Sequence, residues 1–378
     1  MSDDANNDSN DVELRLAAVR GRIDRVDRKI QALLAERGQA ALDVAEIKKG
    51  MNPGEPVSFY RPEREAQILR DVAKRNEGPL ADTSVQRIFR EIISASLALE
   101  EPMKVAYLGP EGTYSHAATE RHFGHAVTTL PEKGISEIFQ TVEAGCARFG
   151  VVPVENSTEG TINHTLDRLM ESPLRICGEV RLRIQHQLLS QETSLDKVRA
   201  VHAHPQSLAQ CRNWLDAHLP GIQRISESSN AAAARLATNT PGIAAIAGEQ
   251  AAERYQLQTL VAGIEDEKTN TTRFLVIGKQ HIPPSGEDST SLLVSAPHKP
   301  GGLRRLLQPL EDAGVSMTRI ESRPGRTGLW EYVFFIDVAG HELDSTLKPV
   351  LEQLSDEAPL LRVLGSYPSA LVESNEMV

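Results

Sequence analysis

The sequence predicts a multidomain protein: an all-α segment, then a two-lobed α/β segment, then an α+β segment. Residues 12–101 have helical periodicity and no convincing strand, whereas residues 103–282 alternate short apolar runs with amphipathic stretches. The last segment follows the order strand, helix, strand, strand, helix, strand. The first two patterns are typical of packed helices and of α/β layers, and the third of a ferredoxin-like sandwich.

The composition narrows the class of protein. A formal net charge of −11 disfavours a nucleic-acid-coating role, and 40% hydrophobic residues is ordinary for a globular protein. The N-terminus is acidic rather than signal-like, and no apolar run approaches the ~20 residues of a membrane span. Cys146, Cys177 and Cys211 are odd in number and lack metal-ligand spacing. We expect a cytoplasmic protein without metal, cofactor, nucleic-acid partner or membrane contact.

Domain boundaries follow from the changes in pattern, because 378 residues exceed what one hydrophobic core usually holds. We expect a disordered tail followed by three domains, with a Pro/Gly-containing linker between the second and the third. The expected ranges are 1–11 for the tail, 12–102 for the helical domain, 103–282 for the α/β domain, 283–288 for the linker and 289–378 for the α+β domain.

The helical segment opens with a long amphipathic helix. Its apolar stripe recurs at steps of four and three through Val19, Ile23, Val26, Ile30 and Leu33. Gly50, Asn52, Pro53 and Gly54 are expected to end the helix. Two more helices are expected, one starting after Pro62 and one spanning about 82–99. Long helices with so few loops predict pairing with a second copy of the chain.

Arg37 occupies the next step of the stripe after Leu33, where an apolar residue is expected. A buried guanidinium needs an anionic partner. Two partners remain open: a carboxylate in an interhelical salt bridge, or a ligand carboxylate bound bidentately. Lys48 lies close to the same face, and Ser96 and Glu100 share a face of the third helix because they are four residues apart.

Arg20 precedes Arg37 by seventeen residues, which is about 26 Å along a straight helix. No small dianion spans that distance. If both guanidinium groups serve one ligand, one of them must come from an antiparallel partner chain.

At these residues, ranges 19–48, 61–69 and 87–100 resemble the all-helical chorismate mutases fused to prephenate dehydratase. The resemblance implies a pericyclic conversion of chorismate to prephenate, helped by conformational restraint and by cations. By position it implies carboxylate contacts from Arg20 of the partner subunit, Arg37 and Arg64, donors to the ether oxygen at Lys48 and Glu100, a hydroxyl contact at Glu65 and a pocket wall at Ser96.

Two positions depart from the family pattern. Arg61 stands where some members have an aspartate that contacts the hydroxyl group. Glu100 replaces a glutamine of some members and must be protonated to donate a hydrogen bond. Burial beside the ether oxygen would favour protonation, because burial raises the pKa of a carboxyl group.

The α/β segment has strand candidates at 104–108, 150–154 and 274–277. Polar or small residues at 112–115, 156–160 and 228–230 are expected to open helices, whose free N–H groups suit carboxylate ligands. Ordinary helix capping is the alternative explanation for the same residues. No GxGxxG fingerprint is present, which disfavours a nicotinamide-dependent enzyme.

These stretches closely resemble the prephenate dehydratase catalytic domain. The matching motifs are GPEGTYSHAA (109–118), VPVENSTEG (152–160), HPQ (204–206) with Gln210 and Cys211, SNAA (229–232) and NTTRF (270–274). The resemblance implies two α/β lobes of the periplasmic-binding-protein type with substrate between them. It also implies loss of CO2 and of hydroxide from prephenate, driven by aromatisation.

The same resemblance implies that Thr272 donates a hydrogen bond to the departing hydroxyl and that Arg273 grips a carboxylate. A threonine hydroxyl is too weak an acid for full proton transfer, so hydrogen bonding is the expected role. The implied substrate contacts are Thr113, Ser115, Asn156, Ser157, Thr158, Gln210, Ser229, Asn230 and Phe274.

The α+β segment contains two further motifs, one at residues 301–303 and one at residues 321–324. They resemble those of ACT domains in phenylalanine-regulated dehydratases, which hold the amino acid at an interface between paired domains. The implied effector-binding residues are Gly301, Gly302, Leu303, Glu321, Ser322, Arg323 and Pro324.

We therefore expect a bifunctional chorismate mutase and prephenate dehydratase of phenylalanine biosynthesis, inhibited by phenylalanine. It is expected to form a homodimer, with pairing of dimers into tetramers left open. Two alternatives are a monofunctional dehydratase whose N-terminal domain only dimerises and a non-catalytic ligand sensor.

Overall fold

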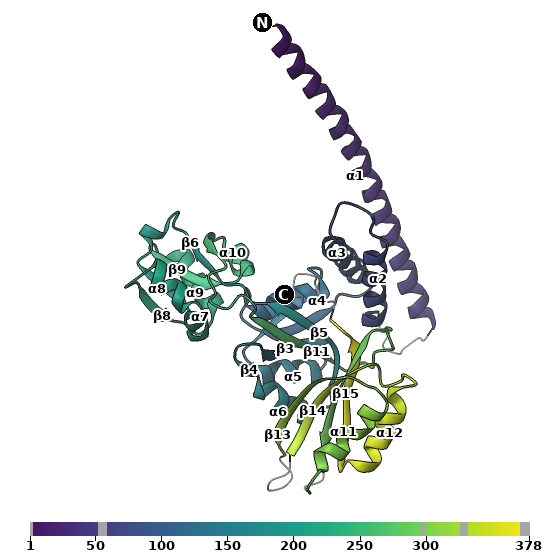
Figure 1. Ribbon diagram of the computed structural model, residues 1–378. Helices are drawn as coiled ribbons and strands as arrows, with labels where there is room; N and C mark the ends of the chain where they lie inside the picture. The colour runs from purple at the N-terminus through teal and green to yellow at the C-terminus, as the bar shows by residue number, and fades with distance from the viewer. Residues whose placement is uncertain (1–2, 52–58, 297–298, 326–331, 371–378) are drawn as a thin grey trace.

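The computed structural model describes residues 3–51, 59–296, 299–325 and 332–370, and Figure 1 shows their arrangement. Three parts follow one another along the chain: three helices, two α/β lobes, and a four-stranded sheet with two helices on one face. The order of elements confirms the expected fold class.

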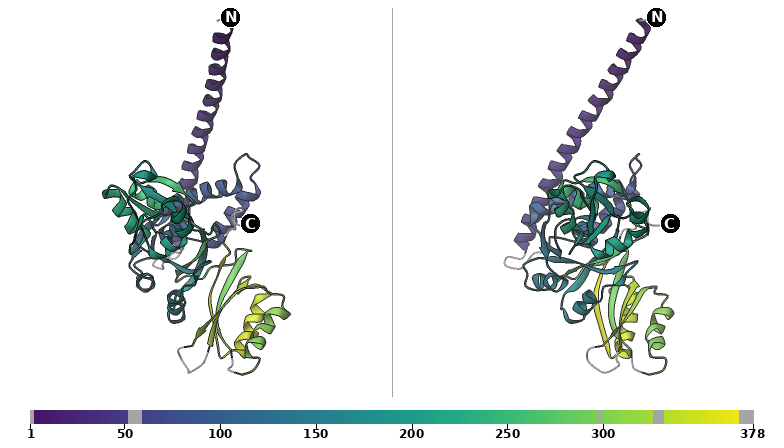
Figure 2. Two further views of the ribbon diagram at one scale, coloured as in Figure 1. Left: turned by 60° about the vertical axis from the view of Figure 1, so that its left-hand side comes forward. Right: turned by 90° about the vertical axis from the view of Figure 1, so that its left-hand side faces the viewer.

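The N-terminal part consists of three helices: α1 (Asp3–Met51), α2 (Pro62–Lys74) and α3 (Asp82–Glu100). α3 packs against both of the others. Figures 1 and 2 show that the N-terminal half of α1 projects away from the rest of the chain in every view. The apolar stripe predicted from the sequence lies on this projecting helix and is exposed.

A disordered tail was expected at residues 1–11, whereas the structure has α1 beginning at Asp3. Residues 3–20 contain no glycine or proline, so nothing in the backbone interrupts the helix there. α1 ends at Met51. Asn52, Pro53 and Gly54, which were expected to stop the helix, lie outside the described residues, as do residues 1–2 of the expected tail and 371–378 of the last domain.

The first α/β lobe is built on a sheet in the order β2-β1-β3-β11-β5, with β4 paired to β3. Its strands are β1 (Lys104–Leu108), β2 (Thr128–Glu132), β3 (Phe149–Asn156), β4 (Gly160–Thr161), β5 (Arg175–Arg183) and β11 (Thr271–Gly278), and its helices are α4 (Tyr114–Phe123), α5 (Ile135–Glu143) and α6 (Asn163–Glu171). β11 is antiparallel to both β3 and β5.

The second lobe has a five-stranded sheet in the order β10-β6-β9-β7-β8. Its elements are β6 (Gln187–Ser190), η1 (Leu195–Lys197), β7 (Ala200–Ala203), α7 (Pro205–Gln210), α8 (Arg212–His218), β8 (Gln223–Ser226), α9 (Asn230–Asn239), β9 (Ile243–Ala247), α10 (Glu249–Tyr255) and β10 (Gln258–Ala262). The chain crosses between the lobes after β5 and again after β10. The second crossing places β11 inside the sheet of the first lobe.

The C-terminal part has antiparallel strands in the order β13-β14-β12-β15. Its elements are β12 (Asp288–Ser295), α11 (Gly302–Asp312), β13 (Met317–Pro324), β14 (Tyr332–Ala339), α12 (Leu347–Glu357) and β15 (Leu360–Pro368). Both helices cover one face, as Figure 2 shows. The predicted order of strands and helices is confirmed.

The uncovered face of this sheet packs directly against the first lobe. Phe335, Leu364 and Tyr367 share one buried cluster with Ile138 and Val152 of the first lobe. β15 approaches β5 so closely that a Cβ added at Gly365 would overlap the backbone of Ile176. The two parts therefore share a core, and only glycine fits at that contact.

The strands expected at 104–108, 150–154 and 274–277 are confirmed, although β3 and β11 are longer than predicted. The helix expected to open at 156–160 is wrong. β3 continues to Asn156 and turns into β4, and α6 begins only at Asn163. The side-chain oxygen of Asn156 accepts hydrogen bonds from the amides of Thr158 and Glu159, both at 3.1 Å, so it stabilises a turn instead of a helix.

Candidate functional sites

The first site lies between α1 and α3. Arg37 of α1 donates from Nη1 to the backbone oxygen of Ile92 at 3.2 Å and to Oγ of Ser96. Ser96 in turn donates to the Ile92 oxygen at 2.7 Å. Burial lowers the pKa of Arg37, and nearby Glu100 opposes that effect. Arg37 thus contacts two neutral oxygens of α3, whereas its position in the sequence predicted an anionic partner.

Glu100, at the end of α3, completes this group. Burial raises the pKa of its carboxyl group, while the charges of Lys48 and Arg37 act in the opposite direction. The Lys48 Nζ atom lies 5.3 Å from the centroid of the Phe59 ring. The structure therefore brings Arg37, Lys48 and Glu100 together with Ser96. Two cations beside a carboxyl group whose pKa is raised by burial suit a compact anionic ligand.

Two other residues expected at this site, Arg64 and Glu65, lie on α2, whereas Arg20 was expected to come from a partner subunit. Arg20 is exposed on the projecting half of α1, and Arg64 is exposed on α2. Glu65 lies 3.5 Å from the Nε atom of Arg90. Burial raises the pKa of Glu65 to about 7, and Arg90 opposes that rise. The carboxyl group of Glu65 therefore faces α3 at Arg90.

Arg61, which replaces an expected aspartate, also has an internal role. Its Nε atom lies 2.6 Å from Oε1 of the buried Glu63 at the start of α2. Arg61, the residue before α2, is thus paired with a glutamate in the first turn of that helix.

The second site is formed where β3 and β11 lie side by side. Thr272 and Asn156 are directly paired across the two strands. The Asn156 Nδ2 atom donates to Thr272 Oγ1 and to Asn270 Oδ1, both at 2.8 Å. Because Thr272 accepts this bond, its own hydroxyl hydrogen remains available as a donor to a ligand.

A chain of hydrogen bonds extends from this pair to the second lobe. The Thr158 hydroxyl donates to Asn156 Oδ1 at 2.6 Å, and Gln210 of α7 donates to Thr158 at 3.2 Å. His186 lies 2.9 Å from Gln210, and Tyr114 lies 2.8 Å from His186. This chain of hydrogen bonds joins the two lobes.

Three members of this series of hydrogen bonds were not predicted from the sequence: Asn270, Tyr114 and His186. Asn270 and Tyr114 lie inside motifs that were recognised, so their motif positions were the signal that could have found them. His186 follows β5 at the crossing between lobes and belongs to no motif. Burial lowers its pKa, against the opposing effects of Gln210 and Glu265, so the imidazole is held neutral.

Several other expected ligand contacts are occupied by local hydrogen bonds. Thr113 caps α4 by accepting from the His116 amide at 3.4 Å, and Ser229 caps α9 by accepting from the Ala232 amide at 3.0 Å. Asn230 accepts from the His204 amide at 2.9 Å. These contacts match the capping alternative.

Two more of these residues are also placed by local structure. Ser157 accepts from the Thr271 amide at 3.0 Å and so ties the turn after β3 to the start of β11. Ser115 is buried in the first turn of α4.

Arg273 and Phe274 require correction. Neighbouring residues of a strand point to opposite faces, so Arg273 faces away from Thr272. Its guanidinium contacts Glu179 of β5 at 2.8 Å, and Asp337 and Tyr367 of the C-terminal sheet at 2.6 and 3.1 Å. Phe274 is 1% exposed within the core of the first lobe. Neither side chain is placed to contact a ligand beside Thr272.

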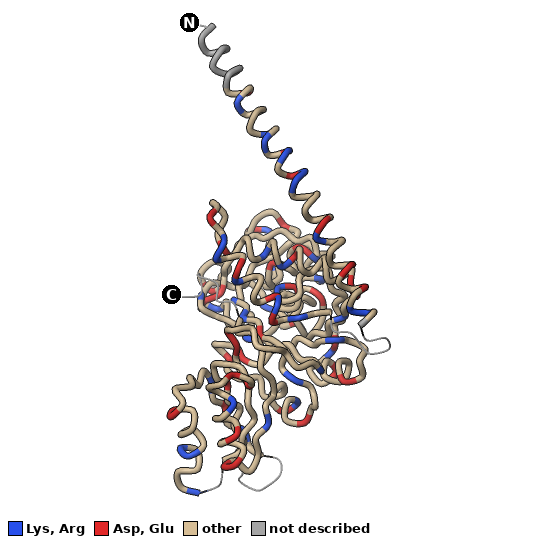
Figure 3. The backbone as a smooth tube through the Cα atoms, turned by 90° about the vertical axis from the view of Figure 1, so that its right-hand side faces the viewer, with Lys and Arg blue, Asp and Glu red and all other residues tan. Residues whose placement is uncertain are grey.

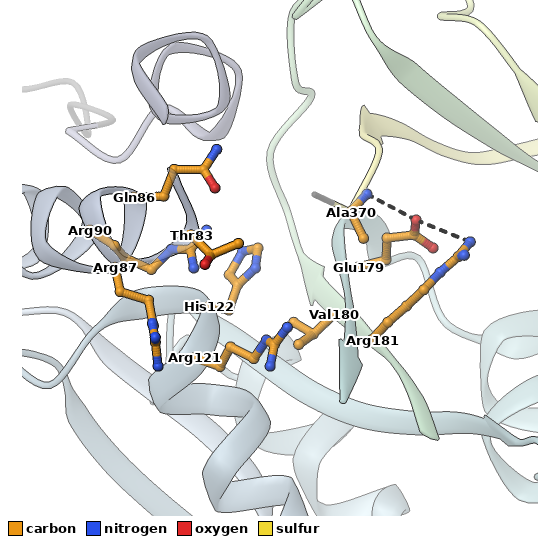
Figure 4. A pocket seen from close by; sticks show the side chains of 10 residues that line it. All are labelled: Thr83, Gln86, Arg87, Arg90, Arg121, His122, Glu179, Val180, Arg181 and Ala370. Carbon is orange, nitrogen blue, oxygen red and sulfur yellow. Dashed lines mark hydrogen bonds and ion pairs between the residues drawn. The ribbon is translucent and has the colours of Figure 1, made fainter. Parts of the chain in front are cut away.

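Figure 4 shows a pocket beside Glu179, between α3, α4 and β5. Arg87, Arg90, Arg121 and Arg181 line it. Glu179 accepts a hydrogen bond from the Ala370 amide at 3.1 Å and lies 3.8 Å from Arg181. Glu179 thus contacts Arg181 and Arg273 of the first lobe and the backbone amide of Ala370.

The expected effector residues lie at one end of the C-terminal sheet. Gly301, at φ +73°, precedes α11, in which Gly302 and Leu303 are the first residues. Ser322 and Pro324 lie at the end of β13 with two charged neighbours that contact the first lobe. Glu321 accepts from Thr161 at 2.9 Å, and Arg323 lies 2.5 Å from Asp167.

Two absences hold for the described part of the chain. No group of three or more His, Cys, Asp or Glu residues in it is placed to bind a metal ion. None of its helices combines the length and apolar character that crossing a bilayer requires.

Comparison with family models divides the chain into three matches. Residues 19–101 match chorismate mutase type II, residues 105–282 match prephenate dehydratase, and residues 290–356 match the ACT domain.

The chain is also similar over nearly its whole length to bifunctional proteins. A bifunctional chorismate mutase/prephenate dehydratase of Stutzerimonas stutzeri is 52% identical over 360 residues, covering 95% of this chain and 99% of that protein. Among solved structures, a prephenate dehydratase of Arthrobacter aurescens in complex with L-Phe has a TM-score of 0.65 and 33% identity, covering 73% of this chain and 91% of that one. GqqA, described as a novel type of quorum-quenching acylase, has a TM-score of 0.65 and 31% identity, covering 70% of this chain and 98% of its own.

Proposed function

We infer the roles of the two sites from the premise that the chain belongs to the family of bifunctional chorismate mutase/prephenate dehydratases. It is a chorismate mutase and a prephenate dehydratase in one polypeptide, and its ACT domain is consistent with regulation by phenylalanine. The monofunctional alternative is not favoured, because the mutase match covers residues 19–101.

The group formed by Arg37, Lys48, Ser96 and Glu100 is the proposed mutase site. The reaction needs chorismate held in a compact conformation and cations at its carboxylates and ether oxygen. The observation that supports this assignment is the gathering of two cations and a carboxyl group with a raised pKa at the α1–α3 contact. Glu65 is left out of the proposed site because it pairs with Arg90.

A second copy of the chain is the proposed partner of α1. The stripe residues are between 49% and 63% exposed, although their spacing is that of a buried helix face. An antiparallel copy would cover this stripe. It would also bring Arg20 of the partner subunit toward Arg37, which the ~26 Å separation within one helix prevents. Figure 3 shows that α1 carries both basic and acidic residues, with basic residues prevailing in the coloured part of its projecting half.

Glu100 acts as a neutral acid in this proposal. Negative charge builds on the ether oxygen as its bond to carbon breaks, and an ionised carboxylate would repel that charge. The protonated carboxyl group instead donates a hydrogen bond, together with Lys48. The raised pKa of Glu100 supports this role, since burial keeps the proton on the group at higher pH.

The Asn156–Thr272 pair is the proposed centre of the dehydratase site. In the reaction the bond between C1 and the carboxylate breaks, and its electron pair enters the ring. The C4–oxygen bond then breaks, and hydroxide leaves and takes up a proton to become water. Thr272 donates a hydrogen bond to the departing oxygen, while Asn156 fixes the orientation of its hydroxyl group.

The cytoplasm is the proposed location. Cys146, Cys177 and Cys211 are all unpaired, and two of them are buried. Unpaired cysteines are typical of a reducing compartment.

The two activities should separate by mutation, because the two sites lie in different domains. Arg37→Ala should lower mutase kcat/KM by about 100-fold or more while dehydratase activity stays within about twofold. Thr272→Ala should lower dehydratase kcat by about 100-fold or more and leave the mutase unchanged. Steady-state rates with chorismate and with prephenate would show this. Loss of both activities in either folded variant would contradict the proposal.

Mixed dimers should restore mutase activity. Arg20→Ala and Arg37→Ala chains, each inactive alone, should give about a quarter of wild-type activity when equal amounts exchange subunits, because half the dimers are mixed and each has one intact site. Exchange is verified with differently tagged chains. No recovery after verified exchange would mean that Arg20 does not serve the partner's site.

The pH dependence of the mutase should report Glu100. Its neutral form exists below its raised pKa, so mutase kcat should fall as the pH rises through that value. Glu100→Gln keeps the shape and supplies a permanent N–H donor, so it should remove the alkaline loss. Mutase kcat is measured against pH for both proteins, with dehydratase kcat as the internal control. Parallel mutase curves would show that Glu100 is not the titrating donor.

A further inference from the structure

The two strands that present the catalytic pair are attached to the ACT sheet by the adjacent residues. Thr272 and Asn156 are paired across β11 and β3, and the next pair in register is Arg273 and Glu155. Both members of this second pair form ion pairs with the ACT domain. One pair therefore faces the dehydratase site, and its neighbour along the same two strands faces the regulatory domain.

The Arg273 contact is deeply buried. The arginine side chain is 12% exposed and Asp337 is 9% exposed, with 2.6 Å between Nη1 and Oδ2. Asp337 also accepts from Ser291 at 2.5 Å, and Ser291 lies 2.8 Å from the hydroxyl of Tyr367. Burial alone would lower the pKa of Arg273, but Tyr367, Asp337 and Glu179 raise it overall, so the arginine stays charged.

The Glu155 contact lies on the neighbouring strand. Arg319 of β13 lies 2.9 Å from Glu155, and it also donates to Thr161 of β4 at 3.2 Å. Thr161 is paired with Glu155 in register and donates to Glu321 of β13. β13 of the ACT sheet therefore holds the hairpin formed by β3 and β4 at the point where Asn156 begins the turn.

A local irregularity makes this arrangement possible. The register between β11 and β3 skips Val154, so Arg273 is paired with Glu155 and Phe274 with Pro153. Such bulges redirect side chains and are common next to active sites. Here Val154 packs in the core shared with the ACT sheet, and Glu155 also reaches that sheet. Asn156 is then left on the face of Thr272.

We propose that Arg273 and Glu155 are positioning residues through which the ACT domain controls the Asn156–Thr272 pair. The proposal rests on the dehydratase role assigned above to that pair. The hydrogen bond between Asn156 and Thr272 depends on the register and separation of β3 and β11. A change in the ACT sheet that pulls on Asp337 and Arg319 would act on both strands one residue away from this bond.

Phenylalanine control needs two states that bind the effector with different affinity. The expected effector residues include Glu321 and Arg323 of β13, on the same strand as Arg319. An effector that shifts β13 would therefore act directly on Glu155. Because β3 is paired with β11, the shift would be passed on to Thr272. This coupling requires no conformational change in any other element.

The matched control is a third ion pair across the same boundary. Arg175 of β5 lies 2.7 Å from Glu342 of the ACT domain, with both side chains partly buried. Arg175 is paired with Gly278, at the far end of β11 from Thr272. If the boundary acted only as a general attachment, removing this pair would have the same effect as removing the other two.

The test compares Asp337→Asn, Arg319→Gln, Arg319→Lys and Glu342→Gln in the full-length chain. Dehydratase kcat and KM are measured without phenylalanine and at concentrations that saturate its binding, with saturation established by calorimetry. The ratio of uninhibited to inhibited rate should fall about tenfold or more in Asp337→Asn and Arg319→Gln, while the phenylalanine Kd stays within about threefold. If the rate without phenylalanine changes, kcat should change and KM should not, because neither residue touches substrate.

Arg319→Lys keeps the charge and should retain most of the inhibition, and Glu342→Gln should behave as wild type. Mutase kcat serves as the measure of folding. If Asp337→Asn does not fold, the contrast between Arg319→Gln and Arg319→Lys decides the question. Wild-type inhibition in Arg319→Gln, or an equal loss in Glu342→Gln, would overturn the coupling role. A wild-type chain without dehydratase activity would instead contradict the proposed function itself.

Discussion

The alternation of side chains along β3 and β11 is the constraint on which the dehydratase half of the molecule depends. A strand must point successive residues to opposite faces, so Thr272 and Arg273 cannot both face the substrate. In the structure one face of these strands carries the proposed catalytic pair and the other contacts the ACT domain. Arg273 is costly to bury and is compensated by Glu179, Asp337 and Tyr367. The position of the catalytic strand thus depends on groups outside the catalytic lobes.

The mutase half depends on a different constraint, the unburied stripe of α1. The exposure of this apolar stripe on so long a helix is the basis of the proposed pairing with a second chain. The two sites therefore obtain their missing parts differently. The dehydratase pair is completed within the chain by the ACT sheet, whereas the proposed mutase site takes a second chain to supply Arg20.

The sequence predicted the order of elements well, because hydrophobic periodicity and Pro/Gly punctuation are local signals. Helical spacing indicated that Arg37 and Lys48 lie near one face of the first helix and that Ser96 and Glu100 share a face of the third. The family resemblance joined these two pairs into one site. Prediction from the sequence failed where the side-chain direction depends on tertiary contacts. A motif containing Thr272 and Arg273 does not reveal that the arginine pairs with a strand more than sixty residues further along the chain. The turn at Asn156 was mistaken for a helix start, because the same polar residues favour both.

Hydrogen–deuterium exchange with and without phenylalanine tests most directly whether the ACT domain reaches the catalytic strands. The account predicts that phenylalanine changes amide exchange in β3 (Phe149–Asn156) and β11 (Thr271–Gly278) as well as in the ACT sheet. In Asp337→Asn the change in β11 should be lost, while the change in the ACT sheet persists. Exchange differences confined to the ACT domain, in wild-type protein that phenylalanine inhibits, would contradict the account.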